Sequence, residues 1–540
     1  MKTLSWGGQF LLLLALWVAL PARAQSPGDA GFLSTLAGLR DASFDDKAKI
    51  IEQISQTGHP SVRAVLTALM EQRLYFRNSD QKIFIGKTAD VDPLNLIDPL
   101  TLKGGGTASA ESVTQIGTNN ALRRVLREAV ARYSLSSPEV SVRRDAAREM
   151  AKSLDEPTVK LLRDRLSVET NAGVRQEIAT DLALAALDSP DGKARLDAVA
   201  TLSNSVSQDV RNRLASLIDS EKDENVKQAA ASAVRSIDHW RTFYSGIQTL
   251  FFGLSLGSVL VLIATGLAIT FGVMGVINMA HGELMMLGAY TTWVVQQAMP
   301  GHIGISILVA IPAAFIVAGL TGVLLERTVI RFLYGRPLET LLATFGVSLI
   351  LQQTVRSIFT ALNRSVVTPE WMSGSLHLND ALEITWNRLY IVLFTLIVFT
   401  LVQLVMKRTR LGLDIRAVSQ NRAMAKAMGI KTEWVDAMTF GLGSGIAGVA
   451  GVALSQLTNV GPDLGQSYII DSFMVVVFGG VGNLWGSLIG GTSMGVVNQL
   501  LEPWAGAVLA KIFVLVALIL FIQARPRGLF PQKGRAAEDK

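Results

Sequence analysis

Hydrophobic and polar residues are distributed very differently in the two parts of this chain. Between positions 26 and 240 apolar residues recur at helical spacing among many charged ones, which predicts amphipathic helices. From Thr242 to Gly282 no Asp, Glu, Lys or Arg occurs, and further apolar segments follow as far as position 523. This pattern predicts a polar helical domain followed by a domain whose helices cross a membrane several times.

The apolar run from Thr242 to Gly282 is too long for one membrane crossing. As a single helix it would measure about 60 Å, whereas a hydrocarbon core is about 30 Å thick. We therefore expect a break at Gly272 or Gly275. Seven further apolar segments cover 284–299, 303–325, 340–360, 389–406, 436–458, 469–501 and 508–523.

Basic residues cluster beside these segments, at 327–336, 407–431 and 525–535. Cytoplasmic loops of membrane proteins carry such an excess of Lys and Arg, so we expect all three clusters on the cytoplasmic side. With the polar domain outside the cytoplasm, segment 469–501 must then cross an even number of times, as a re-entrant loop or a tight hairpin. The glycine-rich stretch at 478–483 supplies the break.

Residues 1–24 have the three parts of a secretory signal peptide. Lys2 supplies the positive end, Phe10 to Leu20 forms the apolar core, and Ala22-Arg23-Ala24 is a small-x-small cleavage site. An uncleaved anchor is the alternative. In both cases the following segment lies outside the cytoplasm.

The polar domain, 25–240, shows an internal recurrence. A V-R-x-x-A/I-A pattern at Val142 returns at Val174, and a step of the same length separates Ala194 from Val226. Helix pairs at a fixed period are typical of α-solenoids and here resemble HEAT-type repeats, while unrelated Ala-rich helices are the alternative. Residues 74–103 differ from this pattern and predict a small hairpin.

The predicted fold class is all-α: an extracytoplasmic helical-repeat domain, a flexible joint at 104–106 within it, and a polytopic membrane domain at 244–524 with a basic tail at 525–540. Only 17% of residues are charged, and 30 of the 44 acidic residues lie in positions 1–244, whereas an ordinary soluble domain has about 25% charged residues. A single soluble enzyme is therefore excluded.

Several kinds of chemistry are also excluded by the sequence. The chain has no Cys, so disulfides, thiolate catalysis and Cys-bound metals cannot occur. It has no G-x-x-x-x-G-K-[ST] motif, so we do not expect it to hydrolyse ATP itself. The basic clusters lack the aromatic interleaving of a nucleic-acid surface. We expect no catalytic residues, no metal, no cofactor and no nucleic-acid partner.

The first candidate site follows the long apolar run. Asn278, His281, Gly282 and Glu283 bring polar and ionisable groups into apolar sequence. Such groups are costly in a membrane and usually face a bundle interior or water. They predict either a polar patch in a translocation pathway or a hydrogen-bonded knot that holds a helix break.

Two further candidates are the loop 410–430 and the glycine-rich stretches 441–451 and 479–491. After Ser419 the loop predicts a short amphipathic helix with Ala and Met on its outer face, suited to docking into another protein or to resting on the membrane. Small residues every three or four positions permit close helix packing, which explains most of the glycines. For Gly479, Gly480 and Gly482 we predict a helix break in a pathway.

These segments resemble the inner-membrane permeases of branched-chain amino acid ABC importers, the LivH-like family. The likeness rests on G-V-x-G-x-I-N-x-A-H-G-E after the first helix, on R-T-R-L-G-x-x-x-R-A in the loop, and on V-x-G-G-x-G-x-x-x-G-x-x-I-G-G near the end. The three motifs occur in matching order over roughly 245–530, more than half of the chain.

The resemblance implies a translocation subunit in a bacterial inner membrane, with its N-terminal domain periplasmic and its C-terminus cytoplasmic. The implied partners are a second permease subunit, two cytoplasmic ATPases and a periplasmic solute-binding protein. Closure of the ATPases would push the loop and switch the access of the cavity. The residues assigned to this contact are Gly412, Asp414, Arg416, Asn421, Met424, Ala425, Met428 and Gly429.

The N-terminal domain departs from the amino-acid permeases, which lack one. A signal peptide, a helical extracytoplasmic domain and an Asp98-Pro99-Leu100-Thr101-Leu102 segment before a LivH-like permease resemble the urea ABC transporter permease. Urea is therefore the expected substrate, with a branched-chain or other amino acid as the alternative. A stand-alone secondary transporter or channel, and a membrane-anchored scaffold, are rival interpretations.

Overall fold

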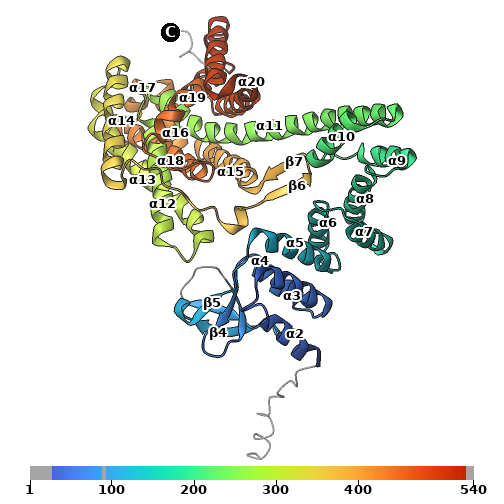
Figure 1. The fold of residues 1–540 in the computed structure, drawn as a ribbon. Helices are drawn as coiled ribbons and strands as arrows, with labels where there is room; N and C mark the ends of the chain where they lie inside the picture. The colour runs from blue at the N-terminus through green and yellow to red at the C-terminus, as the bar shows by residue number, and fades with distance from the viewer. Residues whose placement is uncertain (1–26, 88–92, 531–540) are drawn as a thin grey trace, which may run out of the picture. The chain divides into compact units, whose positions relative to one another are not determined.

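The computed structural model describes residues 27–87 and 93–530, which form two compact units. The first contains the residues up to 237 apart from 206–208, and the second contains the remainder (Figure 1). The predicted signal peptide and the end of the basic tail lie outside the described residues.

The first unit begins with three helices and a small antiparallel sheet of order β4-β3-β2-β1-β5. The helices are α2 (Pro27–Ala37), α3 (Phe44–Gln56) and α4 (Val62–Met70). The strands are β1 (Leu74–Arg77), β2 (Ile83–Gly86), β3 (Leu94–Ile97), β4 (Gly104–Ala108) and β5 (Val113–Gln115). Side chains alternate across the sheet: Leu74 and Ile85 pack with the helices, whereas Tyr75 and Phe84 belong to a separate cluster on the other face.

The all-α prediction was therefore wrong for this segment. β1 and β2 pair antiparallel, with Leu74 opposite Ile85, and three more strands extend the pair into a sheet. The predicted joint at 104–106 is the start of β4, where Gly106 lies opposite Leu96. A triple glycine has no side chain to signal a strand, and its pairing depends on the neighbouring β3.

A run of helices follows the sheet. They are α5 (Asn120–Ser134), α6 (Val140–Met150), α7 (Glu156–Val168), α8 (Ala172–Ala186), α9 (Gly192–Leu202) and α10 (Gln208–Ser220). The guanidinium of Arg143 in α6 donates to both carboxylate oxygens of Glu169, at 2.8 and 2.9 Å. Arg195 in α9 makes the same pair of bonds to Glu221, at 2.8 and 3.0 Å.

These two ion pairs reveal a structural repeat. Arg143 also donates to the carbonyls of Ser137 and Pro138, and Arg195 donates to those of Ser189 and Pro190 at the same offset. The equal steps seen in the sequence link the first and third helices of each copy: α6 to α8, and α9 to the start of α11 (Glu224–Met274). The repeat is thus a helix triplet, and its kinship with HEAT-type repeats stays a prediction.

The second unit is built from long helices and one hairpin. Its helices are α11 (Glu224–Met274, which begins within the first unit), α12 (His281–Ala298), α13 (Ile303–Thr328), α14 (Pro337–Phe359), α15 (Trp386–Arg408), α16 (Arg410–Gln420), α17 (Arg422–Ala427), α18 (Thr432–Ser455), α19 (Leu464–Gly479) and α20 (Leu484–Ala524). The hairpin is β6 (Ser375–Asn379) and β7 (Leu382–Thr385).

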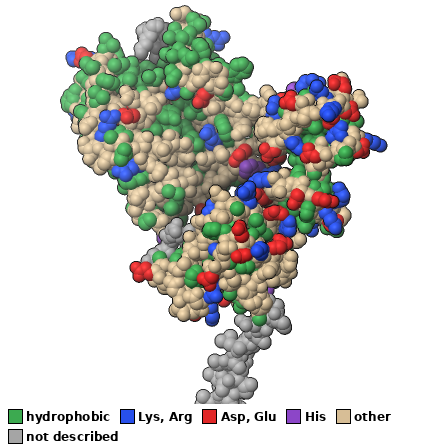
Figure 2. Space-filling model, viewed as in Figure 1, with side chains coloured by type: hydrophobic (Ala, Val, Ile, Leu, Met, Phe, Trp, Pro, Cys, Tyr) green, Lys and Arg blue, Asp and Glu red, His purple; other side chains and the backbone are tan. Residues whose placement is uncertain are grey.

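Six helices in the described part of the chain, α11, α13, α14, α15, α18 and α20, are long and apolar enough to cross a membrane. α19 is a shorter apolar helix, and α12 covers the predicted segment 284–299. Eight apolar segments were predicted. The seventh, 469–501, is divided between α19 and the start of α20, and the eighth continues α20, which is kinked at Gly506 after Pro503. Hydrophobic side chains cover much of the surface of this unit, whereas charged side chains are dispersed over the polar helices (Figure 2).

The helix breaks fall at glycines with left-handed backbone. α11 ends at Met274, directly before Gly275 with φ of +65°, as the length of the apolar run required. Gly272 lies inside α11, where an added Cβ would collide with the Cα of Gly482. The segment 469–501 is broken after Gly479, and Gly480 and Gly482 have φ of +98° and +77°. Such φ values are strained for residues other than glycine.

Candidate transport site and coupling loop

The first candidate segment folds into a turn and the start of α12. Gly275 reverses the chain, and the Asn278 side-chain oxygen accepts a hydrogen bond from the Ala280 backbone N–H at 3.0 Å. Asn favours this kind of local bond, which supplies a partner for an unpaired amide before a helix. The structure thereby places Asn278, His281 and Glu283 at the beginning of α12, where they are at most 1% exposed.

Glu283 is held by side chains of α14. Its Oε1 accepts hydrogen bonds from the Ser348 hydroxyl at 3.0 Å and from the Gln352 amide at 2.7 Å. Earlier in the same helix, the Thr344 hydroxyl accepts from the Met279 N–H at 3.1 Å and Thr340 is buried. The buried side of α14 is therefore polar, at four positions spaced one turn apart.

The opposite side of α14 is apolar and exposed: Leu338, Leu342 and Ile350 are 82, 71 and 66% exposed. A helix with a polar buried side and an apolar exposed side suits a membrane. Lipid covers the apolar side, and the protein must supply hydrogen-bond partners for the polar side. Thr340, Thr344, Ser348 and Gln352 were missed in the sequence analysis. Their regular spacing inside an apolar segment was the signal that could have found them.

Three polar atoms of this cluster have no hydrogen-bond partner among the described residues. They are Nδ2 of Asn278, Nδ1 of His281 and Oε2 of Glu283. The other ring nitrogen of His281 lies 3.0 Å from the carbonyl oxygen of Ile263 in α11. Buried polar groups without partners are costly and need an explanation. The cluster ties α11, α12 and α14 together and leaves hydrogen-bonding capacity unused.

Gly282, the second residue of α12, has a packing role. A Cβ on Gly282 would collide with the Gly465 carbonyl oxygen, so α12 and α19 approach each other with no room for a methyl group. Gly288, further along α12, is equally close to the backbone of Gly448 in α18. The small residues thus bring the membrane helices into backbone contact.

The second predicted break, at 478–483, has different surroundings. The Phe478 carbonyl accepts from the Leu529 N–H at 2.9 Å, and the Gly479 carbonyl accepts from Phe530 at 3.2 Å. A Cβ on Gly480 would stand 2.6 Å from the Phe530 carbonyl oxygen. The structure therefore brings Gly479 and Gly480 against the segment after α20, and it does not bring them together with Asn278 or Glu283.

The loop 410–430 contains two short helices, where one was predicted after Ser419. α16 begins after Thr409, whose hydroxyl accepts from the Gly412 N–H, and a Cβ on Gly412 would collide with the Met406 backbone. Asn421 separates the helices and caps α17 by accepting from the Met424 N–H at 2.9 Å. Gly429, with φ of +89°, ends the second helix.

Two methionines of the loop are exposed to solvent, and the helix that carries them is anchored to α18. Met424 and Met428 are 60 and 77% exposed, whereas Ala425 is buried. Arg422 pairs with the buried carboxylate of Asp436 in α18 and lies 4.2 Å from the ring centre of Tyr334. A rigid helix with exposed, adaptable methionines can dock against another protein.

The two charged residues assigned to the loop contact both belong to α16. Asp414 is half-buried, and Arg416 is exposed. The Arg416 guanidinium donates to the Met406 carbonyl at the end of α15. α16 is therefore tied back to the end of α15, the preceding membrane helix.

Comparison with known proteins identifies the class of the second unit. The profile of the family described as "Branched-chain amino acid transport system / permease component" matches residues 249–523, about half of the chain. The chain belongs to this family. The match begins within α11 and ends within α20, so it covers the buried polar cluster, the loop and both glycine-rich stretches.

Individual relatives agree with the family profile. The chain is 32% identical to the high-affinity branched-chain amino acid transport system permease protein LivH of Salmonella typhimurium, over 52% of this chain and 94% of LivH. It is 30% identical to the corresponding protein BraD of Pseudomonas aeruginosa, over 53% of this chain and 96% of BraD. No solved structure matches the chain. It is a multi-pass membrane permease, as the helices and the family agree.

Proposed function

We propose that this chain is the translocation subunit of an ABC importer in a bacterial inner membrane, and that its substrate is urea. The family and the six long apolar helices of the described chain support the transport role. ATP would be hydrolysed by two cytoplasmic partner subunits, and a second permease and a periplasmic solute-binding protein would complete the importer. In this arrangement the N-terminal unit is periplasmic and the C-terminus is cytoplasmic.

The observation that carries the substrate proposal is the first unit. LivH and BraD are covered over 94 and 96% of their lengths by about half of this chain, so little of either protein is left to match the helix triplets and the sheet. If this chain serves an importer whose substrate is not a branched-chain amino acid, that difference would account for the additional first unit. The uncharged hydroxyl and amide groups along α14 suit a small neutral solute such as urea.

Uptake of labelled urea and labelled leucine, in cells with and without this chain, tests the substrate. We expect at least a tenfold loss of ATP-dependent urea uptake on deletion and unchanged leucine uptake. Loss of leucine uptake alone would replace urea by a branched-chain amino acid, the substrate class that the names of LivH and BraD support. Urea uptake that persists without ATP would point to a channel or secondary transporter.

We also propose that Met424 and Met428 contact the ATPase subunits, with Asn421 and Gly429 holding α17 in place and Gly412 seating α16. Replacing both methionines by Ala removes the exposed apolar contact but leaves the anchor between α17 and α18. We expect uptake to fall about tenfold while ATP hydrolysis by the assembled importer continues. Met299→Ala, in the turn after α12, is the matched control. Coupled uptake at the normal rate in the double variant would exclude this contact.

A further inference from the structure

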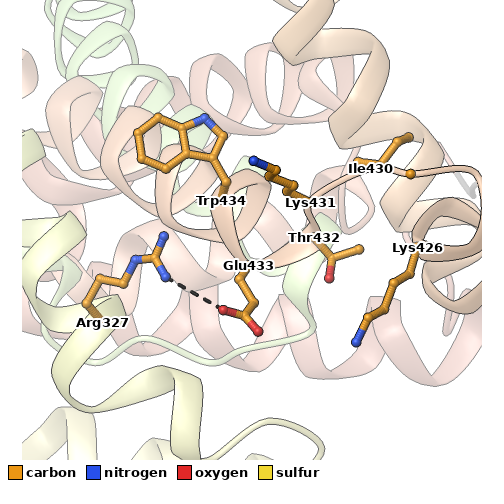
Figure 3. Close-up of a pocket in the computed structure, with 8 residues that line it drawn as sticks. Arg327, Lys426, Ile430, Lys431, Thr432, Glu433 and Trp434 are labelled. Carbon is orange, nitrogen blue, oxygen red and sulfur yellow. Dashed lines mark ion pairs between the residues drawn. The ribbon is translucent and has the colours of Figure 1, made fainter.

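A hollow beside the coupling loop is lined by basic side chains. It has a volume of about 760 Å³ and lies between the end of α13 and the turn that joins α17 to α18. Figure 3 shows the side chains around it: Arg327 comes from one side, Lys426 from another, and Trp434 and Lys431 from the start of α18. Of the residues that line the hollow, Gly429 alone is among those assigned to the coupling contact.

The charges in the hollow are unbalanced. Arg327, Lys426 and Lys431 contribute three positive charges, and Glu433 is the one acid among the residues that line it. Arg327 lies 4.0 Å from Glu433, which is 75% exposed, and 3.6 Å from the buried Glu326 behind it. Within the described residues, Lys426 and Lys431 form no ion pair. An anion in the hollow would therefore meet two ammonium groups with no carboxylate of their own.

The hollow lies at the end of an exposed apolar stripe on α13. Leu320, Leu324 and Arg327 follow one another at helical spacing, so they lie on one side of α13. Leu320 and Leu324 are 65 and 60% exposed, and Trp434 is 57% exposed beside the basic groups. Trp at the end of apolar helices marks the level of lipid headgroups. An acyl chain along the leucines would thus bring its headgroup to Arg327.

We propose that this hollow binds the phosphate-bearing headgroup of an anionic phospholipid. Arg327, Lys426 and Lys431 contact the phosphate, Trp434 lies against the glycerol region, and the acyl chains follow Leu324 and Leu320. Basic pockets between membrane helices recognise anionic lipids in this way. Because the hollow borders α17 and its C-terminal turn, a bound lipid would steady the base of the coupling loop.

The test measures lipid retained by the purified full-length chain in detergent, by native mass spectrometry with phosphatidylglycerol or phosphatidylcholine. We expect clear preference for phosphatidylglycerol. Arg327→Ala with Lys431→Ala should weaken its retention at least tenfold, since each cation near a lipid surface contributes about a fivefold factor. Lys407→Ala with Arg408→Ala removes two exposed cations at the end of α15, outside the hollow, and should have little effect.

A variant that binds more lipid serves as a further control, because misfolding would lower lipid binding and not raise it. Glu433→Gln removes the acid that competes for Arg327 and should raise phosphatidylglycerol retention severalfold. Equal losses in the two double variants, or no preference for phosphatidylglycerol, would overturn the proposal. Displacement of the lipid by millimolar glycerol phosphate would assign the hollow to a soluble phosphate. Unchanged lipid retention with loss of ATPase co-purification would assign it to a protein contact.

Discussion

One buried glutamate in each unit shows how differently a buried carboxylate can be paired. In the first unit, the Glu169 carboxylate is almost fully buried, and both of its oxygens accept hydrogen bonds from Arg143, Arg165 or backbone N–H groups. In the second, one oxygen of Glu283 is bonded to Ser348 and Gln352, while the other has no partner among the described residues.

We interpret this difference as a guide to which buried polar groups are structural and which are candidates for a role in transport. Arg143 and Glu169 recur in the next helix triplet as Arg195 and Glu221, so their arrangement belongs to the repeat and to its stability. The Glu283 cluster is not part of a repeat, and it lies where unpaired polar atoms are most costly. A group retained at that cost, at a helix break of a permease, is the better candidate for a role in transport.

The largest expected effect is the loss of the first ion pair. Glu169→Ala leaves Arg143 buried without its carboxylate, which should destabilise α6–α8 by about 3 kcal/mol. Hydrogen exchange of the full chain measures this loss. Glu221→Ala should cost less, because Arg195 and Glu221 are 16 and 6% exposed against 8 and 0% for Arg143 and Glu169. Equal losses would contradict the argument from burial.

The same pair predicts sensitivity to acid. The hydrogen bonds from Arg143 lower the pKa of Glu169 from 4.5 to about 2. A carboxyl group whose pKa is lowered by folding stabilises the protein above its unfolded pKa, and this contribution is lost as the pH falls from about 4.5 towards 2. Protection of α6–α8 should decline over this interval in the native chain but much less in Glu169→Ala.

Next in size is the close contact between α12 and α19. Gly282→Ala would force α12 away from Gly465, which should destabilise the second unit by about 2 kcal/mol, as overpacking does elsewhere. Gly346→Ala in α14 is the matched control, because a Cβ there has no atom within 4 Å. The melting temperatures of the two variants, measured on the detergent-solubilised chain, distinguish Gly282→Ala from its control. Similar melting temperatures would mean that α12 and α19 can move apart.

At Asp181, a buried acid of the first unit, we expect a smaller effect on stability, and of the opposite sign. Burial raises the pKa of Asp181 in α8 from 3.8 to about 8, and its Oδ2 has no hydrogen-bond partner among the described residues. An acid whose pKa is raised by folding favours the folded state most below about pH 4, and this is lost as the pH rises to 8. Asp181→Asn should stabilise the unit by about 1 kcal/mol at pH 8.

Two measurements check this sign. Hydrogen exchange of α8 should show the gain for Asp181→Asn at pH 8 and little gain at pH 5. Asp145→Asn removes an exposed acid from α6 and should change protection at neither pH. A gain of equal size at both values would trace the effect to packing and not to ionisation.

The smallest effect on stability is expected at the candidate transport cluster. Glu283→Gln keeps an oxygen that accepts from Ser348 and Gln352, so stability should change by less than about 1 kcal/mol. If the negative charge takes part in transport, uptake should nevertheless fall about tenfold. Normal uptake in a stable Glu283→Gln variant would make the cluster a structural knot.

Several features could be predicted from the sequence because their causes are local. The length of the apolar run at 242–282 required a break, and Gly275 provides it because glycine alone adopts its backbone without strain. The break after Gly479 and the exposure of Met424 and Met428 follow in the same way. The family could also be identified, because its three motifs are contiguous in sequence.

Other features depend on partners distant in the chain, so only the tertiary structure decided them. The triple glycine at 104–106 becomes a strand because β3 pairs with it, and the triplet repeat is visible only when Arg143 meets Glu169. Glu283 meets two side chains of α14, and the basic hollow joins α13 to the start of α18. Hydrophobic period and turn chemistry act over short stretches of chain, whereas these contacts require the helices to be packed together.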